Sequence, residues 1–416
     1  YAFTLVFTVT ADSLMKTLAM LFLFASNGLL LFHTANPFGD ILRFLPVSLG
    51  KGVLSAPFVN YTAGMGALSS GAKTKGFWQT AGYVLLGLVI AVPVTAIAGS
   101  LLCQADSGMQ SMIARLFQIP MDSITPLLMH LVIGFLIGLA LFGMLYASVH
   151  RSLPMDADEC AKMTESFHII PSPVVYAAVT PLCLLYVLFF FTQMQYFFGG
   201  YTGDAAGFTY AEYARKGFFE LCWVCCLNFA VIAGMGFLAK RSDGRKPLPL
   251  KIYGTFLCIC SLLLTDTALS KMFLYIRVYG MTQLRVYTSW FMLLLAVLFI
   301  LLLVRQFREH LNFGKLAAIA FTVLTALLCF SRPDAWITRY NAEMYLAGQL
   351  EHFDDSVLRS MSDDAWAALT AYDADTLHKL LHADAEKGLQ DRTDSQSRDL
   401  WESSNLSAWE LLLYRG

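Results

Sequence analysis

The sequence predicts an all-α fold: a polytopic bundle of transmembrane helices followed by a small helical C-terminal domain. Of the 416 residues, 57% are hydrophobic and only 14% are charged, a composition outside the range of soluble globular proteins. Apolar runs of about 20 residues recur along the chain, and this is the length with which a helix crosses a hydrocarbon layer of about 30 Å. None of the runs alternates between polar and apolar residues as barrel strands do.

Eight runs are long and apolar enough to span a membrane. They cover residues 14–33, 77–103, 125–147, 172–198, 217–239, 252–270, 286–304 and 313–330. The opening stretch YAFTLVFTVTA has a similar composition, and we expect it to be the end of a further span. Residues 34–76 are rich in glycine, proline and small residues. We expect an elbow helix at the membrane surface there, with a re-entrant segment as the alternative.

The two parts of the chain differ in charge. Residues 331–416 carry 16 acidic and eight basic side chains, whereas residues 1–330 carry 14 acidic and 21 basic ones. We therefore expect a transmembrane domain over 1–330 and an acidic helical domain over 331–416. Alternate loops hold 14 lysines and arginines on one side and six on the other. Because basic loops remain in the cytoplasm, the acidic domain is predicted to be extracytoplasmic.

The acidic domain reads as a few short helices. Ser362 or Asp363 can cap a helix over 360–369, and a second helix is expected over 373–384. Ser407, followed three residues later by Glu410, predicts a capping box for a last helix over 407–415. Residues 386–399, EKGLQDRTDSQSRD, are polar and are expected to form a flexible loop.

Ionisable side chains in or beside the spans are the first candidates for function, because burying them in a membrane is costly. The stretch TYAEYARKGFFEL, residues 209–221, places Glu212, Arg215, Lys216 and Glu220 at helical spacing. This ladder either anchors a helix at the outer interface or contributes to a site. Asp266, in LLLTDTALSKM, either is buried, where it titrates in a proton or cation path or holds a cationic substrate, or lies close to the outer interface. Both interpretations stay open.

Several classes of chemistry find no support in the sequence. No span carries His, Cys, Asp and Glu at ligand spacing, so no metal is expected. No nucleotide-binding, hydrolase or dinucleotide motif appears, and we expect no cofactor and no catalytic residue set. Cys222 and Cys225 form a C-x-x-C, but inside an apolar helix they are better explained as packing residues. No basic patch interleaved with aromatic residues indicates nucleic-acid binding.

Four stretches resemble a known family. They are FFFTQMQYFFGG (189–200), TYAEYARKGFFEL, ALSKMFLYIRVYGMTQLRVYTSWFMLLLA (268–296) and WITRYN (336–341). In this order they resemble the bacterial polytopic membrane proteins called domain of unknown function 4173, within the wider 4153-like set. The resemblance covers roughly residues 80–380 and includes DDSVLRSMSDDAWAAL near the end. It implies a multi-pass protein of the bacterial cytoplasmic membrane and carries no established activity.

The resemblance covers a set of polar, aromatic and glycine residues, with Lys271 standing where arginine is expected and Asp266 outside the pattern. The set is Tyr210, Glu212, Tyr213, Arg215, Gly217, Glu220, Tyr279, Gly280, Thr282, Arg285, Tyr287 and Asn341. In the predicted topology these residues lie on the outer face. We therefore hypothesise an outward-facing polar pocket formed by Glu212, Arg215, Glu220, Thr282 and Arg285, with Asp266 as a further candidate.

Three functions fit these observations. The first is a non-enzymatic membrane component, transporter-like or envelope-sensing, whose tail is an interaction module. The second is an enzyme acting on a lipid-linked substrate at the outer interface, with Glu212 or Glu220 as base; a groove open to the bilayer would favour it. The third is a structural subunit of a membrane complex. Membrane lipids and a protein bound by the C-terminal domain are the expected partners, and the sequence leaves the oligomeric state open.

Overall fold

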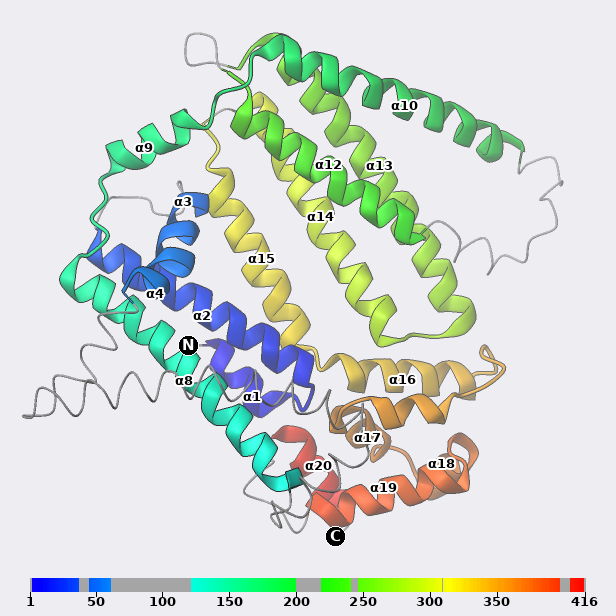
Figure 1. Cartoon of the computed structure of the whole chain (residues 1–416). Helices are drawn as coiled ribbons and strands as arrows, with labels where there is room; N and C mark the ends of the chain where they lie inside the picture. The colour runs from blue at the N-terminus through cyan, green and yellow to red at the C-terminus, as the bar shows by residue number, and fades with distance from the viewer. Residues whose placement is uncertain are drawn as a thin grey trace, which may run out of the picture. The chain divides into compact units, whose positions relative to one another are not determined.

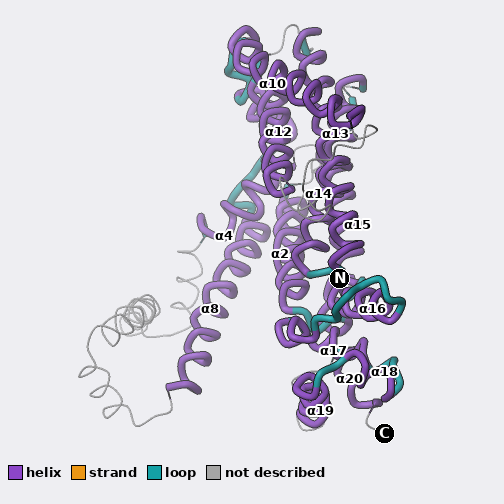
Figure 2. Tube along the Cα trace, turned by 90° about the vertical axis from the view of Figure 1, so that its right-hand side faces the viewer, coloured by secondary structure: helices purple, strands orange, loops and turns teal. Residues whose placement is uncertain are grey.

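The computed structural model describes residues 2–36, 45–60, 121–199, 218–240, 246–308, 310–396 and 405–414. Over these ranges the chain is helical and contains no strand; one isolated bridge joins Ile170 and Ala239 (Figure 2). Seven of the described helices are long and apolar enough to cross a membrane. The chain is therefore a multi-pass membrane protein with the predicted all-α architecture.

The seven candidate spans match seven of the eight predicted runs. They are α2 (Ser13–Ala35), α8 (Met121–His150), α10 (Ser172–Gly199), α12 (Phe218–Leu238), α13 (Leu248–Tyr279), α14 (Gln283–Phe307) and α15 (Phe313–Phe330) (Figure 1). The predicted run 77–103 lies outside the described residues. α13 and α14 are longer than predicted because polar residues at their ends continue the helices beyond the apolar core.

The remaining helices are short. They are η1 (Ala2–Leu5), α1 (Val6–Val9), α3 (Leu45–Leu49), a π-helical segment (Gly50–Ser55), α4 (Ala56–Val59), α9 (Ala157–Ser166), α16 (Pro333–Leu346), η5 (Asp355–Ser360), α17 (Asp363–Leu369), α18 (Ala374–Leu380), α19 (Ala383–Gln396) and α20 (Leu406–Tyr414). The opening stretch thus forms η1 and α1. Within the predicted elbow region, α3, the π segment and α4 make one helix over 45–59.

The chain divides into two compact units. The larger comprises Tyr1–Phe24, Leu42–Leu45 and Ala161–Gly416, and the smaller comprises Ala25–Ile41 and Pro46–Cys160. The larger unit therefore contains the C-terminal helices together with five of the spans and the start of α2. The boundary at residue 330 stays a prediction, as does the side of the membrane that the C-terminal helices face.

Two apolar cores hold the larger unit together. The first lies among the spans, where residues such as Cys225, Leu257 and Phe299 are completely buried between α10, α12, α13 and α14. The second lies where α2, α14 and α15 meet the C-terminal helices, and it runs from Met15 of α2 to Trp366 of α17 without interruption. The C-terminal helices are therefore packed onto the ends of the spans through shared apolar burial, not only connected to them by the chain.

Two local predictions about the C-terminal helices were wrong. Residues 386–396 of the polar stretch expected as a loop belong to α19 (Ala383–Gln396), because Leu389 is buried in the second core and Arg392 pairs with Asp363. Tertiary contacts outweigh its weak local preference. The capping box is not formed either, since the side chain of Asn405 caps α20 by accepting from the Ala408 amide at 3.0 Å. Ser407 and Glu410 bind Arg332 instead.

Candidate functional site

The residues of the predicted polar pocket lie in different environments. Glu212 and Arg215 are outside the described residues. Glu220, in the first turn of α12, and Asp266, in α13, are exposed on the surface of the helices. Of the four described residues, only Thr282 and Arg285 come together, at the connection between α13 and α14. The described residues therefore do not show whether all six candidates line one pocket, and the proposed pocket stays a prediction.

Thr282 and Arg285 both bind the backbone of this connection. The chain leaves α13 through Gly280, whose φ of +77° is a conformation that side-chain-bearing residues avoid. Thr282 is the N-cap of α14 and accepts from the Arg285 amide. The Arg285 guanidinium reaches back to donate to the carbonyl oxygens of Tyr279, at 3.2 Å, and of Gly280. It also lies 4.1 Å above the ring of Tyr275.

Asn341 of α16 completes the connection from outside. Its Oδ1 accepts from the Met281 amide at 2.6 Å, and its Nδ2 donates to the Met281 carbonyl oxygen at 2.8 Å. A side chain at Gly280 would place Cβ 2.7 Å from this Oδ1. The motif Y-G-x-T-x-x-R and Asn341, which carried the family resemblance, thus form a rigid turn between two spans and attach α16 to it.

A second set of polar residues lies beside this turn and is more deeply buried. Asp334, in the first turn of α16, has no exposed surface. Its Oδ1 accepts from Gln283 Nε2 at 2.7 Å, and its Oδ2 accepts from the amide and hydroxyl of Ser362 at 2.8 and 2.7 Å. Asp334 therefore links the start of α14 to the start of α17.

Asp364 joins three further segments and is also completely buried. It accepts hydrogen bonds from the hydroxyl of Thr10 and, at 2.9 Å, from the amide of Ala11, both just before α2. Arg332, between α15 and α16, donates from Nε at 3.3 Å, and Ser407 of α20 donates from its hydroxyl. Residues more than 350 positions apart in the sequence thus meet at one carboxylate.

Arg332 is the cation of this site. Its Nη1 and Nη2 donate to the two carboxylate oxygens of Glu410 at 2.8 and 2.7 Å, a bidentate pair, and Nη2 also donates to Ser407. Burial alone would lower the pKa of Arg332, but the hydrogen bonds to Glu410 and the charge of Asp364 raise it overall. Its φ of +51° is unusual for arginine and is tolerated because these contacts hold the residue in place.

Asp12 is the third nearly buried aspartate, 4% exposed, and caps α2. Its Oδ1 accepts from the Leu14 amide at 2.7 Å, and its Oδ2 accepts from the Tyr287 hydroxyl at 2.8 Å. Burial raises the pKa of Asp12, and the negative charge of Asp334 adds to this effect. We call these seven polar residues the junction cluster: Thr10, Asp12, Arg332, Asp334, Asp364, Ser407 and Glu410.

The junction cluster holds more carboxylates than cations. It has four acidic side chains and one guanidinium, which contacts two of them, Asp364 and Glu410. The three aspartates lie at the N-terminal, positive ends of α2, α16 and α17. Each buried carboxylate already accepts several hydrogen bonds, and the three aspartates have almost no exposed surface. Among the described residues no group of three or more His, Cys, Asp or Glu side chains is arranged to hold a metal ion. The geometry suits fastening of segments better than chemistry on a substrate.

Sequence reasoning missed the junction cluster. Asp334 and Asp364 look like ordinary surface acids in an acidic tail, and each depends on partners from distant segments. The usable signal was local: Asp12 comes directly before an apolar span, and Arg332 and Asp334 come directly after one. Charged residues that border spans on the same side of a bundle can meet there.

The spans contain a separate polar contact. Asn228 of α12, completely buried, accepts from the hydroxyl of Tyr186 on α10 and donates at 2.9 Å to the hydroxyl of Ser261 on α13. Cys225, one turn away, lies 3.4 Å from the Thr265 hydroxyl. These bonds connect three spans, as interhelical polar contacts in membranes commonly do, and they fit the packing interpretation of the C-x-x-C.

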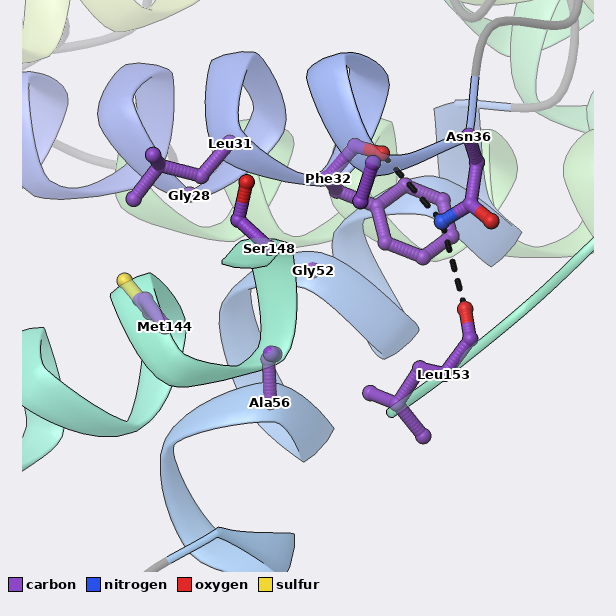
Figure 3. Close-up of a pocket in the computed structure, with 11 residues that line it drawn as sticks. Gly28, Leu31, Phe32, Asn36, Gly52, Ala56, Met144, Ser148 and Leu153 are labelled. Atoms are coloured by element: carbon purple, nitrogen blue, oxygen red, sulfur yellow. Dashed lines mark hydrogen bonds between the residues drawn. The ribbon is translucent and has the colours of Figure 1, made fainter. Parts of the chain in front are cut away.

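The smaller unit contains a pocket where α2, the π segment and α8 approach one another (Figure 3). Gly28 and Gly52 allow this approach, since a Cβ on Gly52 would lie 2.8 Å from Phe32 Cβ. Asn36 borders the pocket and donates to the carbonyl oxygens of Phe32 and Leu153, both at 3.2 Å. The pocket has a volume of about 10 Å³, which is room for about one water molecule. None of the four predicted site residues that the structure describes, Glu220, Asp266, Thr282 and Arg285, lines it.

Comparison with known protein families gives a match over most of the chain. A family model described as Domain of unknown function (DUF4153) matches residues 1–372. No curated protein and no solved structure matches the chain. The sequence motifs indicated the family called domain of unknown function 4173, within the wider 4153-like set. The wider set is confirmed, and the family model that matches is number 4153 and not number 4173. Because the match covers most of the chain, the protein belongs to the family called domain of unknown function DUF4153.

Proposed function

We propose that this protein is a non-enzymatic, envelope-sensing component of the bacterial cytoplasmic membrane. In this proposal the C-terminal helices bind a partner outside the membrane and pass the change to the spans through the junction cluster. The observation that carries it is the bonding of Asp364, which is completely buried and holds the segment before α2, the linker after α15 and α20 at once. Movement of α17 would separate this carboxylate from all of these donors, and movement of α20 would remove the hydroxyl of Ser407.

The energetic argument for coupling is the cost of leaving a buried charge without partners. Removing one partner of a buried ion pair destabilises a protein by about 3–5 kcal/mol, and Asp364 accepts its hydrogen bonds from three other segments. A displaced tail therefore cannot keep the first turn of α2 in its original surroundings. An independent appendage would bond to the spans through exposed contacts, which cost little to break.

Hydrogen exchange of the protein in lipid nanodiscs tests this proposal. Asp364→Asn should speed amide exchange in α17 and also in the first turns of α2, because the neutral amide cannot replace a carboxylate that accepts from three segments. Asp375→Asn, a change at an exposed carboxylate of α18 in the same domain, is the matched control and should alter neither. Faster exchange confined to the C-terminal helices would contradict the coupling and with it the sensing function.

A specific observation favours a second candidate, a transporter-like function. The helix over 45–59 has 15 residues, about half a dozen fewer than a span requires, and its middle is π-helical. Short, irregular helices packed inside a bundle border the substrate sites of many transporters. Proteoliposomes should then take up small solutes faster than empty vesicles, and Gly52→Leu, which intrudes on Phe32 and α2, should abolish the difference. Equal uptake by vesicles with and without the protein would exclude this candidate.

A further inference from the structure

The position of α16 relative to the membrane follows from what borders it. α15 has 18 residues and is about 27 Å long at 1.5 Å per residue, so it ends at the membrane surface if it spans. Only Ser331 and Arg332 separate it from Pro333, the first residue of α16. Three residues of chain reach about 10 Å at most. The first turn of α16 therefore lies at the level where α15 leaves the bilayer.

A second attachment fixes the direction of α16. Asn341 holds both backbone groups of Met281, which lies in the turn between the spans α13 and α14. Asn341 is eight residues beyond Pro333, about 12 Å along the helix axis. Two points of α16 are thus held at the ends of three spans, so the helix runs parallel to the membrane surface. Figure 1 shows α16 crossing the ends of α15, α14 and α13, with α17 beyond it.

The exposed edge of α16 has the composition of a membrane interface. Residues such as Asp334, Ile337 and Ala342 are buried on its inner side. The opposite edge presents Trp336, 49% exposed, and Leu346, 45% exposed, with Arg339 and Glu343 between them. A mixture of tryptophan, aliphatic and charged side chains is typical of helices that lie in the headgroup layer.

The neighbouring span ends point to the same layer. Tyr279, the last residue of α13, is 54% exposed, and Leu284, at the start of α14, is 60% exposed. Tyrosine and tryptophan concentrate at the membrane–water boundary because their rings are apolar and their N–H or O–H groups need a polar partner. Tyr279 ends α13 two residues before Met281, the residue that Asn341 of α16 binds, and Trp336 lies on α16 itself.

We propose that the exposed edge of α16 is a lipid-binding surface, seated in the phospholipid headgroup layer with Trp336 as its anchor. The indole ring would enter the boundary between headgroups and acyl chains, while Arg339 and Glu343 remain among the headgroups. The consequence is that α16 holds the junction cluster at a fixed depth, because Asp334 lies on its inner side. This goes beyond the proposed function, since a lipid-seated α16 is compatible with sensing and with transport.

Tryptophan fluorescence in lipid nanodiscs tests the proposal. The emission of Trp336 is obtained as the difference between the wild-type protein and Trp336→Phe. Phospholipids brominated near the headgroup end of the acyl chain should reduce this difference emission at least about twofold, as expected for an interfacial indole, and iodide in the water should reduce it far less. Trp223, 75% exposed in the span α12, serves as the lipid-facing reference and is isolated in the same way by Trp223→Phe.

The remaining outcomes contradict the proposal. Quenching by iodide without quenching by brominated lipid would place Trp336 in water. Resistance to both quenchers would mean that a protein surface, such as a second copy or a partner, covers this edge. A second variant guards against misfolding of Trp336→Phe: Leu346→Trp in the Trp336→Phe background puts an indole at the other end of the same edge. Its emission should respond to brominated lipid, and failure to do so would refute the lipid-binding surface.

Discussion

Substituting Gly280 by alanine should destabilise the protein strongly, because the residue meets two independent constraints. A φ of +77° with ψ near 180° is a region that only glycine occupies readily, and strain of this kind costs about 1–3 kcal/mol. The new Cβ would also lie 2.7 Å from Asn341 Oδ1. Displacing that side chain puts at risk its two hydrogen bonds to Met281, each worth about 0.5–1.5 kcal/mol. The expected loss is roughly 2–6 kcal/mol in total.

Gly348 offers a matched control. It follows α16, has a similar φ of +68°, and has no atom within 4 Å of the position of a Cβ. Gly348→Ala should therefore cost only the backbone term, about 1–2 kcal/mol. The assay is reversible unfolding in mixed micelles, followed by far-ultraviolet circular dichroism, for both variants and the wild type. Equal destabilisation by the two substitutions would refute the argument that the turn is fixed by the side chain of Asn341.

Three further predictions concern other contacts. Arg285→Ala should lower the free energy of unfolding by about 1–3 kcal/mol. Arg285→Lys should restore only part of this loss, because lysine lacks the planar guanidinium that donates to both carbonyl oxygens; full stability of the lysine variant in the same unfolding assay would contradict this role. Asn228→Ala should cost about 1–2 kcal/mol, because the Tyr186 hydroxyl on α10 loses its acceptor and the bond to Ser261 on α13 is removed, and an unchanged unfolding curve would show that the contact adds nothing. Burial alone would raise the pKa of Asp355, but hydrogen bonds from His382 lower it overall, below 3.8. The contribution of Asp355 to stability is therefore present above that pH and is lost as the pH falls through the lowered pKa. Below about pH 4, amide exchange around α18 should become faster relative to the intrinsic rate at each pH, less steeply in Asp355→Asn, and identical profiles for the two proteins would contradict this assignment.

The fold was largely predictable from the sequence because membrane spans have a strong local signal. The run 313–330 was predicted with the same ends as α15, since apolar residues fill it and polar residues border it. The start of α14 was placed three residues too late because Gln283 and Arg285 look like loop residues. They continue the helix since Thr282 caps it and Arg285 folds back over the turn. Such bonds follow from tertiary structure and not from hydropathy.

The candidate site was less predictable because its residues depend on distant partners. The motif around Gly280 was found, but the sequence did not indicate that the Arg285 guanidinium donates to the backbone of the turn. The decisive partner, Asn341, is 60 residues away. The burial of Asp364 depends on Thr10, Arg332 and Ser407, none of which is near it in the sequence. A single sequence carries no information on such pairs beyond the residue types.

A double-mutant cycle between Thr10 and Asp364 tests most directly whether the C-terminal helices are fastened to the start of the first described span. The unfolding free energies of the wild type, Thr10→Ala, Asp364→Asn and the double variant are measured under one set of conditions. A hydrogen bond to a buried carboxylate should give a coupling energy of at least about 1 kcal/mol. Effects that add to within about 0.5 kcal/mol would mean that the two residues do not interact, and the account of the junction cluster would be wrong.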